Sequence, residues 1–151
     1  MGLTSGIAVT TGYEEEKSVL VVDDNSFARA AISALLEQEG CRVTQCPDGA
    51  TALTAVEEGT FDAILIDYTM PDLNGAVVTV MLRQRHLRLN IIGMSMDERS
   101  HDFINAGADA FLMKPLDIVD LLGLLRTART VKQDRRNREV CISPISFTCM
   151  K

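Results

Sequence analysis

Aromatic side chains are scarce in this chain of 151 residues, which contains no tryptophan, two tyrosines and five phenylalanines. Hydrophobic residues still make up 46% of the chain, so a core must be built mainly from aliphatic side chains. No apolar run approaches the roughly 18 residues that cross a bilayer. No secretory signal pattern opens the chain either. We therefore expect one cytoplasmic domain with no membrane partner.

Zinc-binding cysteine pairs and an excess of basic residues are also missing. The four cysteines lack C-x-x-C spacing, which argues against a zinc site, and cytosolic thiols stay reduced. They are Cys41, Cys46, Cys141 and Cys149. Fifteen Lys and Arg stand against 21 Asp and Glu, a net charge of -6. That balance argues against nucleic acid as a partner.

What the chain does contain is a regular alternation of short apolar runs and helical patterns. The runs at 18–22, 42–46, 63–66, 91–94 and 110–113 predict five strands. The segments between and after them predict five helices. Such alternation is typical of an α/β fold, in which helices cover both faces of a doubly wound parallel sheet.

Capping residues predict where the helices begin and end. Asn25 or Ser26 can start the first helix, in which Phe27, Ala31, Ala34 and Leu35 share one stripe. Asp48 can start the second helix, and the third runs from about Gly75 to Arg85. The fourth is expected from Asp97 to Asn105. Asp117 can cap the last, which directs Ile118, Leu121, Leu122 and Leu125 inward.

Polar residues follow the apolar runs at the points where the strands end. Asp23 and Asp24 follow the first run, Asp67 the third, Ser95 the fourth and Lys114 the fifth. Because the carboxyl ends of parallel strands lie along one edge of the sheet, these side chains should share a rim. Each residue alone is an ordinary cap or turn residue. Their joint placement indicates a site.

The residue types at this rim favour phosphoryl chemistry with a divalent cation. Three neighbouring carboxylates repel one another unless a cation lies among them. Oxygen ligands suit Mg²⁺ (or Mn²⁺), which often bridges to phosphate. A carboxylate can also attack a phosphoryl group, whose oxygens Lys114 and Ser95 would then hold.

Four motifs make the chain resemble a known family. They are "VLVVDDN", "ILIDYTMPDLNG", "IIGMS" and "AGADAFLMKPL". With them the chain resembles the receiver domains of two-component response regulators, the CheY-like family. The resemblance implies a five-stranded parallel sheet in the order 2-1-3-4-5 with five helices. It places a receiver at residues 17–130 and leaves extensions at 1–16 and 131–151, in which no output domain fits.

The resemblance also implies a role for each residue at the rim. Asp67 becomes the phosphoacceptor, Asp24 a direct metal ligand and Asp23 an acid that reaches the metal through water. Thr69 would offer its backbone carbonyl to the metal. Lys114 would pair with the phosphoryl group, and a cis peptide would precede Pro115.

Two residues are expected to switch with phosphorylation, and two more to tune it. Ser95 would turn its hydroxyl toward the phosphoryl group, and the rotamer of Phe111 would report the change, although ordinary core packing explains Phe111 equally well. Met96 is bulkier than expected beside Ser95 and should narrow access. Asp97, like Thr69, could set how water reaches a phosphoaspartate. The interval from Ser95 to Lys114 is also shorter than the family implies.

The sequence therefore predicts a phosphoacceptor signalling protein rather than an enzyme. It would have at most weak activity in its own phosphorylation and dephosphorylation. A histidine kinase or phosphotransfer protein of a phosphorelay would phosphorylate it, and the signal would pass on through protein contacts to an unidentified downstream partner. We expect a stand-alone response regulator. The alternatives are the C-terminal receiver of a hybrid histidine kinase and a phosphorylation-independent interaction module.

Two other classes of protein, an aspartyl phosphatase and a flavodoxin-like protein, fit the sequence less well. An aspartyl phosphatase of the haloacid dehalogenase type needs a second acid where this chain has Thr69. A flavodoxin-like protein needs a phosphate-binding loop where this chain has Asp23-Asp24-Asn25.

Overall fold

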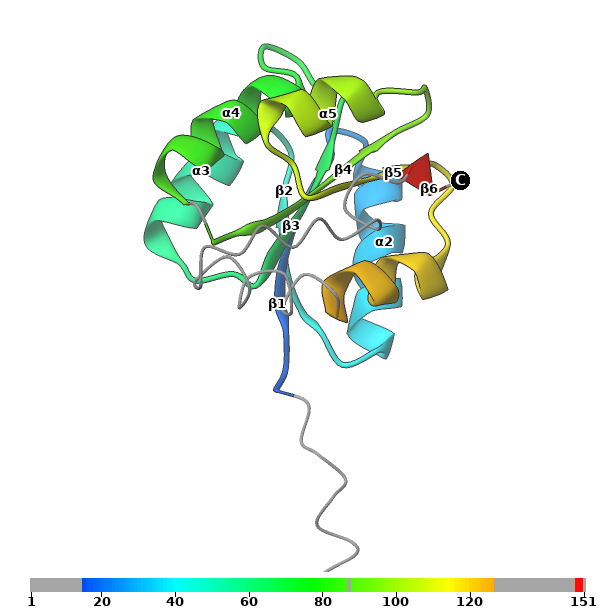
Figure 1. Cartoon of the computed structure of the whole chain (residues 1–151). Helices are drawn as coiled ribbons and strands as arrows, with labels where there is room; N and C mark the ends of the chain where they lie inside the picture. Colours follow the sequence, from blue (N-terminus) through cyan, green and yellow to red (C-terminus); the bar gives the residue numbers. More distant parts are fainter. Residues whose placement is uncertain (1–14, 87, 127–148, 151) are drawn as a thin grey trace, which may run out of the picture.

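The computed structural model describes residues 15–86, 88–126 and 149–150. Its centre is one parallel sheet in the order β2-β1-β3-β4-β5-β6 (Figure 1). The first five strands confirm the predicted fold class and strand order. The strands are β1 (Ser18–Val22), β2 (Arg42–Cys46), β3 (Ala63–Asp67), β4 (Asn90–Ser95), β5 (Ala110–Met113) and β6 (Cys149–Met150).

Helices cover both faces of this sheet. They are α2 (Ser26–Gln38), α3 (Gly49–Glu58), α4 (Gly75–Arg85) and α5 (Ser100–Ala106), with a further helix at 118–126. Figure 1 shows α2 and the 118–126 helix on one face and α3, α4 and α5 on the other. No helix among the described residues is both long and apolar enough to span a membrane.

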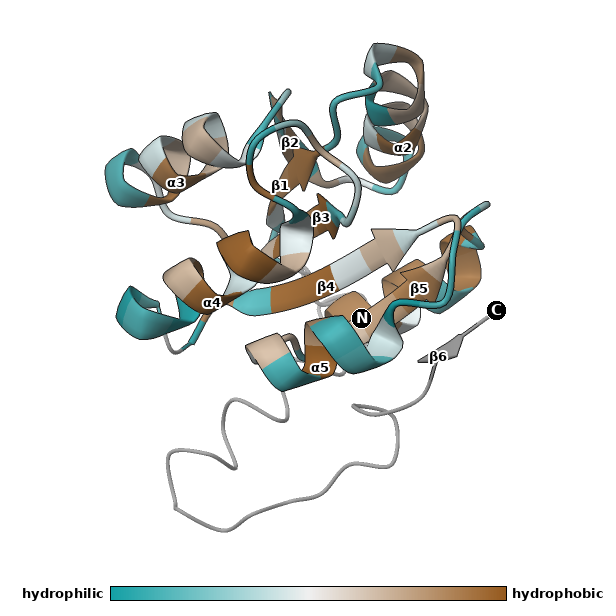
Figure 2. Cartoon of the chain, turned by 90° about the horizontal axis from the view of Figure 1, so that it is seen from above, coloured by the Kyte–Doolittle hydropathy of each residue, from teal (hydrophilic) through white to brown (hydrophobic). Residues whose placement is uncertain are grey.

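Two hydrophobic layers result, and alternate residues of each strand supply them. Val19 and Val21 of β1 face the layer under α2 and the 118–126 helix, whereas Leu20 and Val22 face the layer under α3, α4 and α5. Apolar strands (brown) lie between helices whose outer turns are more hydrophilic (Figure 2). Because every residue of β3 is buried, the strand brings Asp67 to its end with an apolar environment behind it.

The caps largely follow the sequence-based expectations. Asn25 accepts hydrogen bonds from the backbone N–H groups of Phe27 and Ala28, and Asp48 accepts from Thr51. Asp117 accepts from Val119 at 2.7 Å. These side chains satisfy N–H groups that lack partners within the helix.

The start of the expected fourth helix differs from the prediction. This helix, α5, begins at Ser100 rather than Asp97 and holds only seven residues. Residues 96–99 form the loop before it. The shortness predicted for the interval between Ser95 and Lys114 therefore falls in this loop and helix.

The predicted stripe of α2 does not pack against the sheet. Phe27 is 87% exposed and Leu35 40% exposed, while Ile32 and Leu36 are buried instead. Both sets of residues have helical spacing, so periodicity alone could not decide between them. The expectation that Phe27, Ala31, Ala34 and Leu35 form the packed stripe of this helix was wrong. The larger ring stays in solvent near the start of the helix.

The sixth strand is an addition that the sequence did not predict. Cys149 and Met150 pair in parallel with Phe111 and Leu112, which extends the sheet beyond the edge that β5 would otherwise form. Most of the predicted extensions, residues 1–14 and 131–148, lie outside the described residues. The proposed receiver limits at 17 and 130 stay predictions.

Candidate functional site: an acidic pocket at the strand ends

The carboxyl ends of β1, β3, β4 and β5 meet at one edge of the sheet, as expected for a doubly wound fold. Asp23 directly follows β1, while Asp67 and Ser95 are the last residues of β3 and β4. Lys114 directly follows β5, and its N–H donates to the Ser95 carbonyl at 2.8 Å. The structure thus brings the predicted rim residues together.

Three carboxylates form the acidic part of this site. Asp23, Asp24 and Asp67 each offer an oxygen, and these oxygens lie within 4.8 Å of one another. Asp23 is fully buried, Asp67 is 6% exposed and Asp24 is exposed. The cluster therefore opens to solvent on the side of Asp24.

Lys114 bridges two of the acids. Its Nζ lies 2.6 Å from Asp23 Oδ2 and 3.0 Å from Asp67 Oδ1. The Asp23 Oδ1 oxygen accepts from the backbone N–H of Asn25 at 2.9 Å. Within the described part of the chain, Asp67 Oδ2 has no hydrogen-bond partner. Asp67 thus keeps one free oxygen, whereas both oxygens of Asp23 are engaged.

Burial and charge act against each other at these groups. Burial raises the pKa of Asp67 above its usual value; Lys114 opposes the shift, and the neighbouring Asp23 and Asp24 charges add to it. Burial alone would lower the pKa of Lys114, but its hydrogen bonds and charge interactions with Asp23 and Asp67 outweigh it. The pKa of Lys114 is therefore raised, and its ammonium group stays charged.

Ser95 and Phe111, the two predicted switch residues, are both buried. Ser95 is 2% exposed, and its Oγ accepts from the Asp97 backbone N–H at 3.1 Å. Phe111 is 1% exposed, and its ring centroid lies 5.8 Å from that of Phe103. Core packing therefore accounts for the position of Phe111 in this structure.

The remaining predicted residues lie on the loops around the pocket. Thr69 is exposed two residues beyond Asp67, and Met96 is 69% exposed beside Ser95. Asp97 contributes its backbone N–H to Ser95, while its side chain is exposed. The peptide between Lys114 and Pro115 is cis, as the resemblance implied.

Several supporting residues were not found from the sequence. Arg29 Nη1 donates to the Asp23 carbonyl at 2.6 Å and so holds the end of β1 in place. Gly75 allows α4 to start against β3, because a Cβ there would lie 2.3 Å from the Asp67 carbonyl oxygen. The Arg99 guanidinium lies 4.5 Å from the centre of the Tyr68 ring. Only Gly75, in the turn-rich run after Asp67, carried a visible signal.

A divalent cation fits the residues present. Three carboxylates carry more negative charge than Lys114 alone can balance, and Asp24 adds an exposed oxygen at the mouth. An all-oxygen set suits Mg²⁺ better than metals that favour thiolate or imidazole ligands. Receiver domains bind Mg²⁺ at an acidic pocket of this kind.

Comparison with known proteins agrees with this geometry. Residues 19–126 match the response regulator receiver domain family, and the chain belongs to that family. It is 32% identical over 126 residues to the transcription factor prr1 of Schizosaccharomyces pombe, an alignment that covers 80% of this chain and 23% of prr1. It is 33% identical over 108 residues to the autoinducer sensor kinase/phosphatase CqsS of Vibrio cholerae, covering 68% of this chain and 16% of CqsS. The chain thus spans less than a quarter of these relatives.

Solved structures show the same fold. A CheY-like receiver domain protein from Methanospirillum hungatei superposes with a TM-score of 0.74 at 27% identity, covering 80% of this chain and 99% of that one. The response regulator TrrA of Thermotoga maritima, solved in complex with Mg²⁺-BeF, gives a TM-score of 0.70 at 25% identity and covers 74% of this chain and 98% of that one. The chain is thus a receiver domain of two-component signalling, a signalling module rather than a typical enzyme.

Proposed function

We propose that this protein accepts a phosphoryl group on Asp67 from a histidine kinase or phosphotransfer protein. The observation that carries the proposal is the arrangement of Lys114 and the acids: Lys114 holds Asp67 Oδ1 at 3.0 Å while Oδ2 stays free of hydrogen bonds from the described residues. A free carboxylate oxygen beside a fixed cation is suited to attack phosphorus.

In this mechanism Asp67 Oδ2 bonds to the phosphorus of a phosphohistidine as the phosphorus–nitrogen bond breaks. The histidine ring, with a proton on its other nitrogen, leaves as neutral imidazole. Lys114 pairs with the phosphoryl oxygens, since its ammonium group already lies between Asp23 and Asp67. The chain therefore contributes mainly positioning and charge stabilisation.

Asp23, Asp24, Asp67 and the backbone carbonyl of Thr69 would hold Mg²⁺. The bound ion supplies positive charge for the oxygens of the transferred group. TrrA, the relative solved with Mg²⁺-BeF, supports this assignment. Asp24 is the most accessible of the three acids and would offer the ion an exposed oxygen.

The response to phosphorylation would start at Ser95. Its hydroxyl now accepts from the Asp97 N–H, and it would leave this partner to donate to a phosphoryl oxygen on Asp67. The loop that carries Met96 and Asp97 would follow. Phe111 would then change rotamer within the space it shares with Phe103. Access of donors and water to Asp67 would be set by Thr69, Met96 and Asp97. The protein would then phosphorylate itself from small donors and dephosphorylate itself only weakly.

We propose that the protein works as a stand-alone response regulator that signals through protein contacts in the cytoplasm, where ATP supplies phosphohistidine. The match to the M. hungatei receiver domain protein, which covers 99% of that chain, supports this proposal. The alternative is the receiver of a hybrid kinase, favoured by the match to CqsS. The mass of the native protein in its own cells distinguishes the two.

The test is incubation with Mg²⁺ and acetyl phosphate, followed by intact mass measurement. Wild type and Asp72→Asn should each gain one phosphoryl group, and Asp67→Asn should gain none. Asp72 is the matched control because it is exposed and has a φ of 68°, which asparagine also adopts. If neither acetyl phosphate nor a phosphorylated kinase modifies the wild type, the result favours a phosphorylation-independent interaction module.

A further inference from the structure

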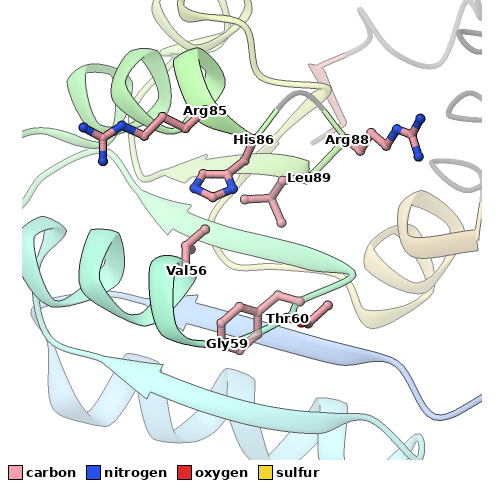
Figure 3. A pocket seen from close by; sticks show the side chains of 8 residues that line it. Val56, Gly59, Thr60, Arg85, His86, Arg88 and Leu89 are labelled. Atoms are coloured by element: carbon pink, nitrogen blue, oxygen red, sulfur yellow. The ribbon is translucent and has the colours of Figure 1, made fainter.

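A hollow opens at the opposite end of the sheet from Asp67, between the end of α3 and the turn that joins α4 to β4. Its volume is about 550 Å³, within the range of ordinary small-molecule sites. Four of its lining residues lie between Val56 and Phe61, and the other four are Arg85, His86, Arg88 and Leu89. We call this hollow the basal groove (Figure 3).

The floor of the basal groove is apolar. Val56 and Leu89 are each 7% exposed and belong to the core layer under α3 and α4, and Phe61 packs against the same layer. The groove therefore reaches down to the hydrophobic core. An occupant with an apolar body would cover the part of Phe61 that the fold leaves exposed.

The rim of the basal groove is cationic. Arg85, His86 and Arg88 line it, and none of its eight lining residues is acidic, although the whole chain has a net charge of -6. In Figure 3 the side chains of Arg85 and Arg88 extend from opposite ends of the turn, and His86 and Leu89 lie between them. The groove thus combines an apolar floor with basic residues on the turn beside it.

The two arginines differ in their partners. Glu57 Oε1 accepts from Arg85 Nη1 at 3.1 Å and lies 3.4 Å from His86 Nε2. Within the described part of the chain, Arg88 has neither an ion pair nor a side-chain hydrogen bond. The dipole of α4 favours Arg85 in its last turn. It does not account for Arg88, which lies beyond the helix.

We propose that the basal groove binds a small amphiphilic anion, with one carboxylate or phosphate group at Arg88 and a short apolar body over Val56, Phe61 and Leu89. Charge complementarity selects the head group, because Arg88 is the cation of this groove that has no ion pair with any of the described residues. The apolar floor selects the body. This site is separate from Asp67 and does not rest on the proposed phosphorylation.

Hexanoate is a suitable probe, with acetate as the head group alone and hexan-1-ol as the body alone. Each is titrated into the full-length ¹⁵N-labelled protein while amide shifts are followed. Hexanoate should give saturable shifts at Thr60, Arg88 and Leu89, and acetate and hexan-1-ol should each bind at least about tenfold more weakly, since each lacks one of the two interactions.

Variants separate the head-group contact from general charge. Arg88→Gln should weaken hexanoate binding roughly fivefold to tenfold, the size expected of one charge-assisted contact at a partly exposed site. Arg42→Gln is the control, because Arg42 is an exposed arginine of β2 paired with Glu16. It should leave the affinity unchanged, as should Asp67→Asn.

Three results overturn the proposal. They are equal affinity for hexan-1-ol and hexanoate, unchanged affinity in Arg88→Gln, and hexanoate shifts that gather at Lys114 instead of the groove.

Discussion

Replacing Asp67 with asparagine should stabilise the protein while it removes the phosphoacceptor. Asp23, Asp24 and Asp67 place oxygens within 4.8 Å of one another, so each pair repels by at least about 3.5 kcal/mol at an effective dielectric constant of about 20. Because Asp24 is exposed, screening by water reduces its repulsion of Asp67 to roughly half of this value. The attraction between Lys114 and Asp67, whose charged atoms lie 3.0 Å apart, is about 5.5 kcal/mol at the same dielectric constant.

For Asp67 the repulsion from the two acids is therefore at least about as large as the attraction to Lys114, and the cost of burying the Asp67 charge makes the balance unfavourable. Asparagine is nearly the same size and carries no charge, and Lys114 keeps its contact with Asp23 at 2.6 Å. We expect Asp67→Asn to raise the free energy of unfolding at neutral pH by about 1 kcal/mol, or roughly 3 °C in Tm. Asp72→Asn should stay within about 0.5 kcal/mol of wild type.

The pH dependence follows from the raised pKa of Asp67. Asp67 binds a proton more tightly in the folded protein than in the unfolded chain. As the pH rises from 3.8, the ordinary pKa of an aspartate, through the raised pKa of folded Asp67, this group therefore lowers the free energy of unfolding. The advantage of Asp67→Asn should therefore be full above that window and shrink as pH falls toward 4.

Thermal unfolding in EDTA at several pH values measures this difference. Excess Mg²⁺ should then raise the Tm of wild type more than that of the variant, because the ion binds the folded carboxylates. A variant that is equally or less stable than wild type at neutral pH in EDTA would refute the electrostatic reasoning.

Three further substitutions test the surroundings of the site. Met96→Ala should speed phosphorylation by acetyl phosphate, because Met96 is a bulky exposed residue directly after Ser95 and is expected to narrow access to Asp67. Equal rates in the two proteins would contradict this. Phe27→Ala, which removes a ring that is 87% exposed near the acidic pocket, should lower the kcat/KM for a phosphohistidine protein about tenfold and leave acetyl phosphate kinetics unchanged. A loss with both donors would show damage to the pocket instead. Gly75→Ala should lower the free energy of unfolding by about 1–3 kcal/mol, since the added Cβ would meet the Asp67 carbonyl oxygen. Gly123→Ala, whose added Cβ would have nothing within 4 Å, should be neutral or stabilising. Similar urea midpoints for the two variants would argue against the close approach at Gly75.

The sequence predicted the arrangement of strands because β1, β3 and β4 are apolar on both faces, a pattern that buried parallel strands require. It also predicted which polar residues meet, since topology alone brings the ends of these strands together. Asp23, Asp67, Ser95 and Lys114 all lie where this reasoning placed them.

Features that depend on three-dimensional packing could not be predicted in the same way. In α2 two apolar sets have helical spacing, and only the shape of the core selects Ile32 and Leu36 over Phe27 and Leu35. The contact of Arg29 with the Asp23 carbonyl depends on a side-chain path that periodicity does not describe. β6 depends on pairing between segments that are distant in the chain, for which a two-residue strand gives no local signal.

The most direct test of the central claim is to locate the phosphoryl group. The protein is phosphorylated in Mg²⁺, reduced with borohydride, which converts an aspartyl phosphate to homoserine, and digested for peptide sequencing by mass spectrometry. The structure predicts homoserine at position 67 and at no other aspartate, with none in a sample treated in EDTA. Homoserine at Asp23 or Asp24, or a phosphoryl group that persists in Asp67→Asn, would contradict the assignment of Asp67 as the phosphoacceptor.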